Sequence, residues 1–402
     1  MNFLHDARTR LGFDVREIAA QLDISPAAWK ELERSDYDNI DTELLMALRD
    51  LLGLDMDSLL DGRFPERHPV ATLLKCSTNT LPVATRLAIS AATSAGRDYT
   101  TLRTIIDPEQ PGTAWTWLKT TRPDRDYSHP REGKPEKLAA RARRKLGLSE
   151  DAPIPSMRDL LWSKGVLLLE DDFSDELDAC SMGTALVAPL ILTNTSGTHM
   201  QTGTGRRVAW AHELLHLLYD RPMMLGVKRY CVIAPGPGRV RGDWAFMERR
   251  ARSFSVHFLA PRRSVQALWS SSSDPVKKRF RQVMETFGIG YEATRNHLYN
   301  LGLLPHKEAP SSISASMPQW DTPERLPTPD APGASGLPAL RHLHKLGTPA
   351  IRGGFFAQRV LETFLAHRRQ ITPGQVADLL RVPNGAFQRD YLADMREHTP
   401  TG

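Results

Sequence analysis

Residues 205–219 constrain the fold most, because their apolar side chains would cover nearly every side of a helix. Val208, Trp210 and Ala211 point in different directions at helical spacing, and four leucines follow them. A helix that is apolar nearly all round is buried. The same segment carries His212-Glu213-Leu214-Leu215-His216, and buried polar side chains need partners. A bound metal ion is an efficient partner for such a set.

The five residues have the HExxH spacing of zinc peptidases. Histidines four residues apart lie on one face of a helix, roughly 6 Å apart, so both imidazoles can reach one ion. Glu213 is left to act as the general base. A catalytic site needs a third protein ligand, and Glu248, 32 residues after His216, lies at the edge of an apolar helical stripe. We predict a metal site of His212, His216 and Glu248, with Glu213 as the catalytic residue.

The surroundings of this motif resemble the ImmA/IrrE family of metallopeptidases. The resemblance rests on Arg207 to His216, on Glu248 to Ser255 followed by Phe258-Leu259-Ala260-Pro261, and on the upstream Ile191-Leu192-Thr193-Asn194. It covers about residues 134–306 and implies an α+β fold with a zincin-like metallopeptidase domain. It also implies that zinc is the cofactor, and manganese could take the place of zinc. The family usually has Gly, Asn and Ala where this chain has Leu215, Arg252 and Ser255, a difference that bears on substrate fit.

The resemblance further implies a zinc metalloendopeptidase that acts in gene regulation. Members of the family cut helix-turn-helix repressors in stress or mobile-element responses. The expected protein substrate is therefore a helix-turn-helix repressor or an antitoxin. Two other interpretations stay open: a DNA-binding transcription regulator whose metallopeptidase-like domain senses a ligand without cutting, and the toxin of a toxin–antitoxin pair.

Charge is distributed unevenly along the chain. Residues 1–62 hold 6 Lys/Arg against 14 Asp/Glu, although the whole chain has a net charge of +5. A phosphate backbone would be repelled by the first part and attracted by the rest. No stretch is apolar enough to span a bilayer, and the first residues lack the order of a secretory signal. With three widely spaced cysteines and no disulfide framework, we expect a cytoplasmic protein without a membrane partner.

Residues 1–62 also resemble a Cro/repressor-type (XRE) helix-turn-helix domain, which adds an all-α module to the fold. Ser25 is placed to cap the would-be recognition helix, with Pro26 at its first position. This interpretation turns Ser25 and Lys30 toward a DNA groove. A protein partner fits the acidic surroundings equally well. The expected helices lie at 3–11, 15–22, 26–34, 41–52 and 55–60.

The tail, residues 339–402, repeats the pattern of this module. Five apolar residues match five in the first module at a constant offset of 358: Ile18, Ala19, Leu22, Ile24 and Trp29 correspond to Val376, Ala377, Leu380, Val382 and Phe387. The tail holds 9 Lys/Arg and 5 Asp/Glu. If any part of the chain contacts DNA, Asn384, Gln388 and Arg389 suit it better than the first module. A plain helical tail is the alternative.

The chain therefore divides into five regions. These are a helix-turn-helix domain (1–62), a connecting region of unknown fold with one helix at 81–95 (63–133), the metallopeptidase domain (134–308), a Pro/Ser-rich linker (309–338) and the small helical tail, a possible second helix-turn-helix (339–402). Within the metallopeptidase domain we expect strands at 166–170 and 190–193 and helices at 135–146, 156–164, 205–219, 243–259, 275–287 and 291–300.

Several residues of this region have more than one possible role. Cys231 lies between the two ligand helices and could bind the metal as a thiolate in a latent enzyme, or it could be an ordinary buried thiol. Tyr219, Arg221 and His257 are alternative donors to an oxyanion. The basic clusters at 141–145, 249–252 and 277–281 are typical of solvated faces, and a bound nucleic-acid activator is the alternative.

Overall fold

Two apolar runs form neighbouring strands of a three-stranded sheet. β1 (Leu167–Asp171) and β3 (Leu190–Asn194) pair in parallel, with Leu169 opposite Leu192. β2 (Ala179–Met182) pairs antiparallel with β3, so that the strand order is β1-β3-β2. Every residue of β3 is buried. The sequence did not predict β2, because Ala-Cys-Ser-Met is too short and too mixed in polarity to show a strand pattern.

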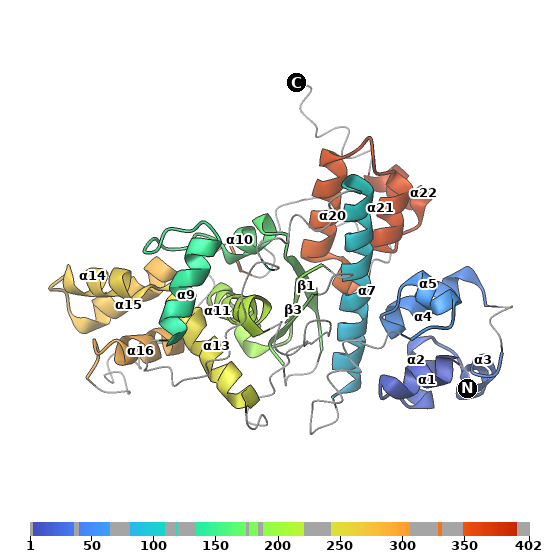
Figure 1. Ribbon diagram of the computed structural model, residues 1–402, viewed down its shortest axis with the longest axis horizontal. Helices are drawn as coiled ribbons and strands as arrows, with labels where there is room; N and C mark the ends of the chain where they lie inside the picture. The colour runs from blue at the N-terminus through green and yellow to red at the C-terminus, as the bar shows by residue number, and fades with distance from the viewer. Residues whose placement is uncertain are drawn as a thin grey trace.

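In the computed structural model this small sheet lies among helices, which confirms the α+β class (Figure 1). The structure describes residues 3–35, 40–64, 81–108, 118, 134–173, 177–183, 188–220, 243–305, 329–331 and 349–391. The helices of the region predicted as the metallopeptidase are α9 (Lys134–Lys145), α10 (Met157–Ser163), α11 (Gly203–Leu215), α13 (Asp243–Leu259), α14 (Arg262–Ser270), α15 (Val276–Phe287) and α16 (Tyr291–Asn300), with a 3-10 turn η3 (Thr198–Gln201) and a π-helical turn η4 (His216–Asp220). The sequence prediction lacked α14.

The motif helix α11 is largely buried, as its composition predicts. Trp210 is fully buried, and its indole Nε1 donates a hydrogen bond to Thr193 Oγ1 of β3 at 2.9 Å. Its ring meets the ring of Phe355 on α20 (Gly354–Ala366) edge-on, with centroids 6.1 Å apart. α13 packs along α11, and α9 packs on α13. The helix is therefore covered by the sheet, by α13 and by a helix of the tail.

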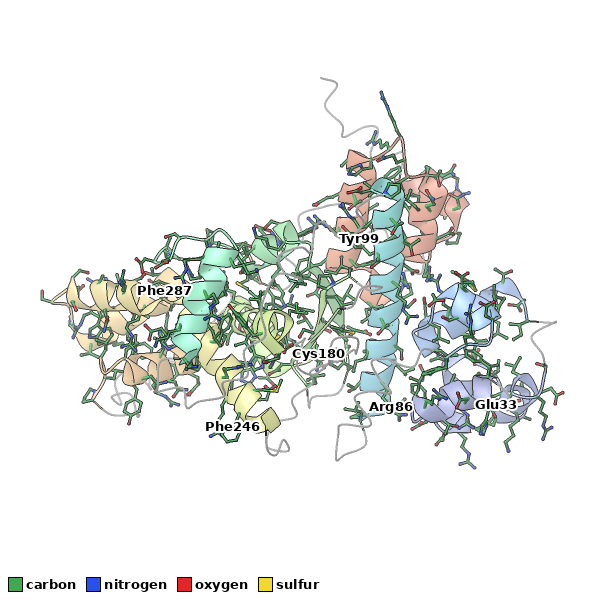
Figure 2. The ribbon with its side chains drawn as sticks, in the orientation of Figure 1. Glu33, Arg86, Tyr99, Cys180, Phe246 and Phe287 are labelled. Atoms are coloured by element: carbon green, nitrogen blue, oxygen red, sulfur yellow. The ribbon has the colours of Figure 1, made fainter. Side chains whose placement is uncertain are left out.

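The N-terminal module forms the five expected short helices. Asp14 and Glu17 close a capping box at the start of α2. Ser25 Oγ accepts from the backbone N–H of Ala28 at 3.0 Å and so caps α3. Trp29 is fully buried and donates to Glu33 Oε1 at 2.8 Å. Figure 2 labels Glu33 on this module. The bounds are α1 (Phe3–Arg10), α2 (Val15–Gln21), α3 (Pro26–Leu32), α4 (Thr42–Leu52) and α5 (Met56–Leu60).

A single long helix, α7 (Val83–Ile106), runs between the N-terminal module and the sheet (Figure 1). The predicted helix ended at residue 95, but Tyr99 and Leu102 continue the apolar spacing and are buried. Small buried residues at its centre let the sheet region approach closely, and the backbone N–H of Ala188 donates to Thr100 Oγ1 at 2.8 Å. Among the described residues no helix has the length and apolarity to cross a membrane.

The tail contains η7 (Ala350–Arg352), α20, α21 (Pro373–Leu380), α22 (Asn384–Ala386) and the π-helical turn η8 (Phe387–Tyr391). α20 packs against β1. On its other side it contacts α7, where Arg359 Nε donates to the Tyr99 hydroxyl at 3.0 Å. Figure 2 shows Tyr99 on α7 beside the tail helices. The tail thus packs against both β1 and α7.

The composition of residues 309–338 predicts a solvated linker, yet Asp330 within it is fully buried. Its carboxylate accepts hydrogen bonds from the backbone N–H groups of Met157 and Arg158, at 3.0 and 2.8 Å, at the start of α10. It also accepts from the guanidinium of Arg207 on α11 at 2.6 Å. Most of the segment lies outside the described residues, but its Asp330 is a buried structural group and not a solvated one.

Replacing Asp330 with alanine should lower the free energy of unfolding by about 3 to 5 kcal/mol, because it leaves the buried Arg207 without a counter-charge. Urea or thermal unfolding measures this change. The matched control is Asp274→Ala, which removes an exposed pair with Lys278 and should cost at most about 1 kcal/mol. Equal losses in the two variants would contradict the structural role of Asp330.

Candidate metal centre

Three side chains from α11, η4 and α13 meet at one buried point. His212 Nε2 lies 3.0 Å from Glu248 Oε2, and His216 Nε2 lies 3.3 Å from Glu248 Oε1. The two imidazole Nε2 atoms face each other at 3.0 Å. All three ligand atoms lie within 4.8 Å of one another. The structure thus brings together the histidine pair and the carboxylate that the sequence singled out from two separate helices.

The donor set fits a divalent metal ion. Glu248 is only 4% exposed, and within the described residues neither of its carboxylate oxygens accepts a hydrogen bond of good geometry. Two imidazole nitrogens point at the same place as this carboxylate. Such a set of two neutral imidazoles and one carboxylate is typical of catalytic zinc sites, which keep a further position open. A cation at this point would satisfy all three groups.

A second pair of residues orients His216. Its Nδ1 lies 2.7 Å from Asp220 Oδ2, and the other oxygen of Asp220 accepts from the guanidinium of Arg250. Asp220 and His216 are fully buried and Arg250 is 1% exposed. When Nδ1 carries the proton and donates to Asp220, the lone pair of Nε2 is free for a metal. Neither residue was predicted from the sequence, although Asp220 follows His216 by four positions, the spacing of side chains on one helix face.

The electrostatics of the site favour an ionised Glu248. Burial favours the neutral form of His216, but the charge of Glu248 and the hydrogen bond with Asp220 outweigh it and raise the pKa of His216 to about 10. Burial likewise opposes ionisation of Glu248, and the two histidines outweigh it and lower its pKa below the usual range. Without an ion, a protonated His216 therefore balances the negative charge of Glu248, which a bound metal would otherwise neutralise.

Glu213 lies beside this cluster on α11. It is 2% exposed, and its Oε2 has no hydrogen-bond partner among the described residues. Burial raises the pKa of Glu213, against the opposing effect of the two histidines and a hydrogen bond with Ser181 of β2. A carboxyl group with a raised pKa and one free oxygen is suited to accept and return a proton near neutral pH. The neighbouring Cys180 is fully buried, and burial raises the pKa of its thiol well above the usual value, so it is an inert core residue.

The alternatives for an oxyanion donor are reduced by the structure. The Tyr219 hydroxyl donates to the backbone carbonyl of Leu138 on α9 at 3.2 Å, which turns it away from the metal ligands. His257 is buried against His297 of α16, with ring centroids 4.7 Å apart. Arg221 lies outside the described residues, and so does Cys231, the proposed latent thiolate ligand.

Two arginines from the basic clusters are structural and not solvated. Arg143 is 1% exposed and donates to the backbone carbonyl of Phe258 and to that of Ser149. Arg250 is the partner of Asp220. Charge runs usually lie on solvated faces, but a helix that packs on both sides turns some members of the run inward. These two side chains are therefore unavailable to a nucleic-acid activator.

The residues predicted to contact DNA lie on the surface of the two outer modules. Ser25 and Lys30 are exposed on the N-terminal module, although the Ser25 hydroxyl oxygen already caps α3. Asn384, Gln388 and Arg389 are exposed on the tail. None of the five belongs to the metal centre. No protein-family model, curated protein or solved structure matches this chain.

Replacing Asp220 with asparagine should weaken metal binding by about 10- to 100-fold, because the second group that orients a metal-binding histidine contributes that much to affinity. Competition with a chromophoric chelator measures the metal dissociation constant. Asp172→Asn, an exposed change of the same charge, is the control and should leave affinity unchanged. Equal affinity in the two variants would show that Asp220 does not support the site.

The buried pair of His257 and His297 predicts a core that is sensitive to acid. Burial lowers the pKa of His257 to about 4 and that of His297 to about 3, with a smaller effect from the Arg262 charge on both. Glu136, which pairs with Arg262 at 2.9 Å, opposes the shift of His297. Because both folded-state values lie below the unfolded value of about 6.5, the unfolded chain takes up protons first as the pH falls.

Metal-free protein should therefore lose stability as the pH falls from about 6.5 toward 4. The variant His297→Gln should lose less over the same window, because one of the two acid-sensitive groups is gone. His367→Gln, on the tail, should follow the wild type. Urea unfolding at a series of pH values gives the three profiles, and parallel profiles for wild type and His297→Gln would refute the expectation.

Proposed function

We propose that this protein is a zincin-like metallopeptidase of the kind represented by the ImmA/IrrE family. The proposal is carried by one arrangement: the carboxyl of Glu213, buried and with one free oxygen, lies beside the convergent His212, His216 and Glu248. A structural role for these groups would leave their buried polar atoms satisfied by protein neighbours. Glu213 retains an oxygen without a hydrogen-bond partner in the described residues, and the oxygens of Glu248 face the two histidine nitrogens at 3.0 and 3.3 Å.

His212, His216 and Glu248 would hold zinc, or manganese in its place. When bound, such an ion supplies a Lewis acid that polarises the scissile carbonyl and lowers the pKa of water toward neutrality. Glu213 accepts the proton of the attacking water and returns it to the leaving amine. Asp220, held by Arg250, would accept the Nδ1 proton of His216, so that Nε2 of His216 is directed at the other two ligands. Each of these residues therefore has a separate role.

The sheet offers a place for an extended substrate. In the part of the chain that the structure describes, β2 pairs with β3 alone and is the last strand of the sheet. Ser181 of β2 forms a hydrogen bond with Glu213, which brings this edge strand next to the proposed base. A peptide that added its backbone to the edge of β2 would lie beside Glu213. Strand addition binds the substrate through its backbone, as an endopeptidase requires.

The N-terminal module favours a protein substrate over DNA. Its basic residues are partly used within the module: Arg8 pairs with Glu33 at 2.6 Å and Arg10 pairs with Asp6 at 2.8 Å. With 14 acidic residues against 6 basic ones in residues 1–62, it repels a phosphate backbone. A helix-turn-helix repressor or antitoxin with a basic surface is the complementary partner, and its cleavage would change gene expression.

Glu213→Gln should bind metal as the wild type does and lose at least about 100-fold in cleavage rate, because it can no longer accept a proton. The full chain is incubated with zinc or manganese and with a purified helix-turn-helix repressor, and fragments are followed by mass spectrometry. Glu292→Gln, an exposed change of the same chemistry on α16, is the control.

Cleavage by Glu213→Gln at the wild-type rate would refute the peptidase mechanism. Intact substrate in the presence of metal-loaded wild type, with Glu213→Gln regulating normally in cells, would favour the sensor that does not cut. Metal content measured on the same samples separates a failed reaction from an empty site.

A further inference from the structure

The tail repeats the backbone of the N-terminal helix-turn-helix pair, at the offset of 358 residues. α2 begins with a capping box formed by Asp14 and Glu17. α21 begins with a capping box formed by Thr372 and Gln375, the residues at the corresponding positions. Reciprocal caps of this kind fix where a helix starts. The two helices thus begin at equivalent residues with equivalent hydrogen bonds.

The turns that follow the two helices also correspond. Asp23, just after α2, has φ 52°, and Arg381, just after α21, has φ 56°. In the described residues these are the only non-glycine residues with positive φ, and they lie 358 positions apart. A left-handed conformation is costly for a residue with a side chain, so its recurrence at one position of both units marks a shared turn.

The cores of the two units agree as well. Trp29 of α3 and Phe387 of η8 are both fully buried. Ile18 and Val376 are fully buried in the first helix, and Phe13 and Ile371 are nearly so just before it. Cap, turn and core together identify α21 with α22 and η8 as a second helix-turn-helix unit.

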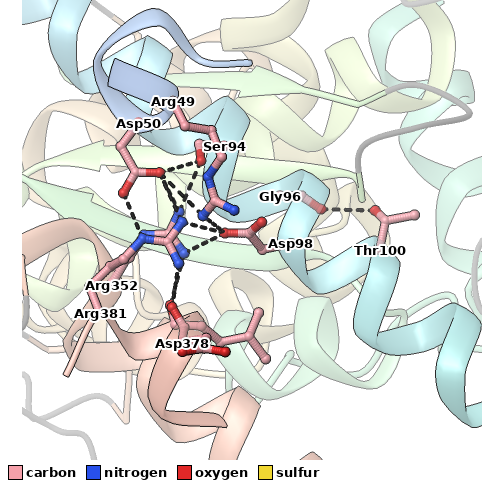
Figure 3. Close-up of polar contacts among 10 residues, drawn as sticks. Arg49, Asp50, Ser94, Gly96, Asp98, Thr100, Arg352, Asp378 and Arg381 are labelled. Carbon is pink, nitrogen blue, oxygen red and sulfur yellow. Dashed lines mark hydrogen bonds and ion pairs between the residues drawn. The ribbon is translucent and has the colours of Figure 1, made fainter. Parts of the chain in front are cut away.

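One side of this unit is fixed to the rest of the protein by arginines (Figure 3). Arg381 donates to both oxygens of Asp50 on α4, at 2.9 Å each, and to Asp98 on α7 at 2.9 Å. Arg352 is 1% exposed and contacts the same two carboxylates at 3.0 and 2.8 Å. The side chain at the turn therefore points inward, and the orientation of the unit is set against α4 and α7.

The unit and the residues just before it expose polar and basic side chains that we call the tail face: Arg368, Arg369, Asn384, Gln388 and Arg389. All five are exposed. Gln388 Nε2 donates to Asn384 Oδ1 at 2.9 Å. The exposed acidic residue of α21, Asp378, lies beside Arg381 in Figure 3. In Figure 1, α22 lies on the side of the tail that faces away from the sheet.

The N-terminal module has a different character at the same positions. The equivalents of Gln388 and Arg389 are Lys30 and Glu31, and the equivalent of Arg369 is the buried Leu11. A unit that binds DNA needs basic side chains for phosphates and amide side chains for base edges, on the second helix and beside the first. The tail face has both kinds. The first module keeps basic residues at two of these positions, Arg10 and Lys30, but has Pro26 in place of Asn384 and Glu31 in place of Arg389.

We propose that the tail face binds double-stranded DNA. Arg368, Arg369 and Arg389 contact phosphates, and Asn384 and Gln388 face base edges in the major groove. The protein would then hold DNA through residues that are separate from the candidate metal centre. The proposal does not depend on catalysis, because none of these residues touches the metal centre.

The test uses the full-length Glu213→Gln chain and a fluorescently labelled, mixed-sequence DNA duplex of about 24 base pairs, followed by anisotropy from about 50 to 200 mM salt. Arg368→Ala/Arg369→Ala/Arg389→Ala should weaken binding by at least about tenfold at low salt. It should also reduce the slope of log affinity against log salt by about two to three, since each lost phosphate contact removes about one.

The matched control is Arg16→Ala/Lys30→Ala/Arg34→Ala, which removes three exposed basic residues from the first module. It changes the net charge equally and should leave affinity within about twofold, so that any general charge effect is subtracted. Thermal unfolding of both triple variants confirms that they fold. Failure of the chain to bind the duplex, or an equal or larger loss in the control, overturns the proposal and points to a protein partner for the tail face.

Discussion

Arg207 and Trp210 tie α11 to parts of the chain far from it in sequence, and the candidate metal centre depends on this enclosure. Arg207 pairs with Asp330, and Trp210 contacts both β3 and Phe355 of the tail. Charged groups interact more strongly where they are buried than in bulk water. The sheet, α10, α13 and α20 therefore act together to bury three polar side chains, although only α11, η4 and α13 supply them.

This enclosure also explains which parts of the structure the sequence could predict. The apolar content of α11 showed that it is buried, and the spacing of His212 and His216 showed that they share a face. Glu248 came from a second periodic stripe. Asp220 and Arg250 were missed, because a charged residue beside a motif looks the same in sequence whether it is solvated or buried. Only the packing of α13 on α11 turns Arg250 toward Asp220.

Contacts between residues far apart in the sequence are the second feature that could not be predicted. The strand β2 lacks a pattern of its own and forms because β3 offers a paired edge. The composition of residues 309–338 describes a linker on average, while the carboxylate of Asp330 within it is buried against Arg207. The offset of 358 residues was visible in sequence, and the structure adds the turn residues Asp23 and Arg381. At this turn, Asp23 of the first unit is exposed to solvent, whereas Arg381 of the second unit forms ion pairs with Asp50 and Asp98.

Asp330 contacts both the start of α10 and Arg207 of α11, and it therefore gives the chain between residue 305 and the tail one fixed point on the central helices. The tail is held independently of this point, because α20 packs on β1 and the arginines of the tail pair with Asp50 and Asp98. Loss of the Asp330 carboxylate would therefore disturb α10 and α11 directly, while the contacts that dock the tail would stay in place.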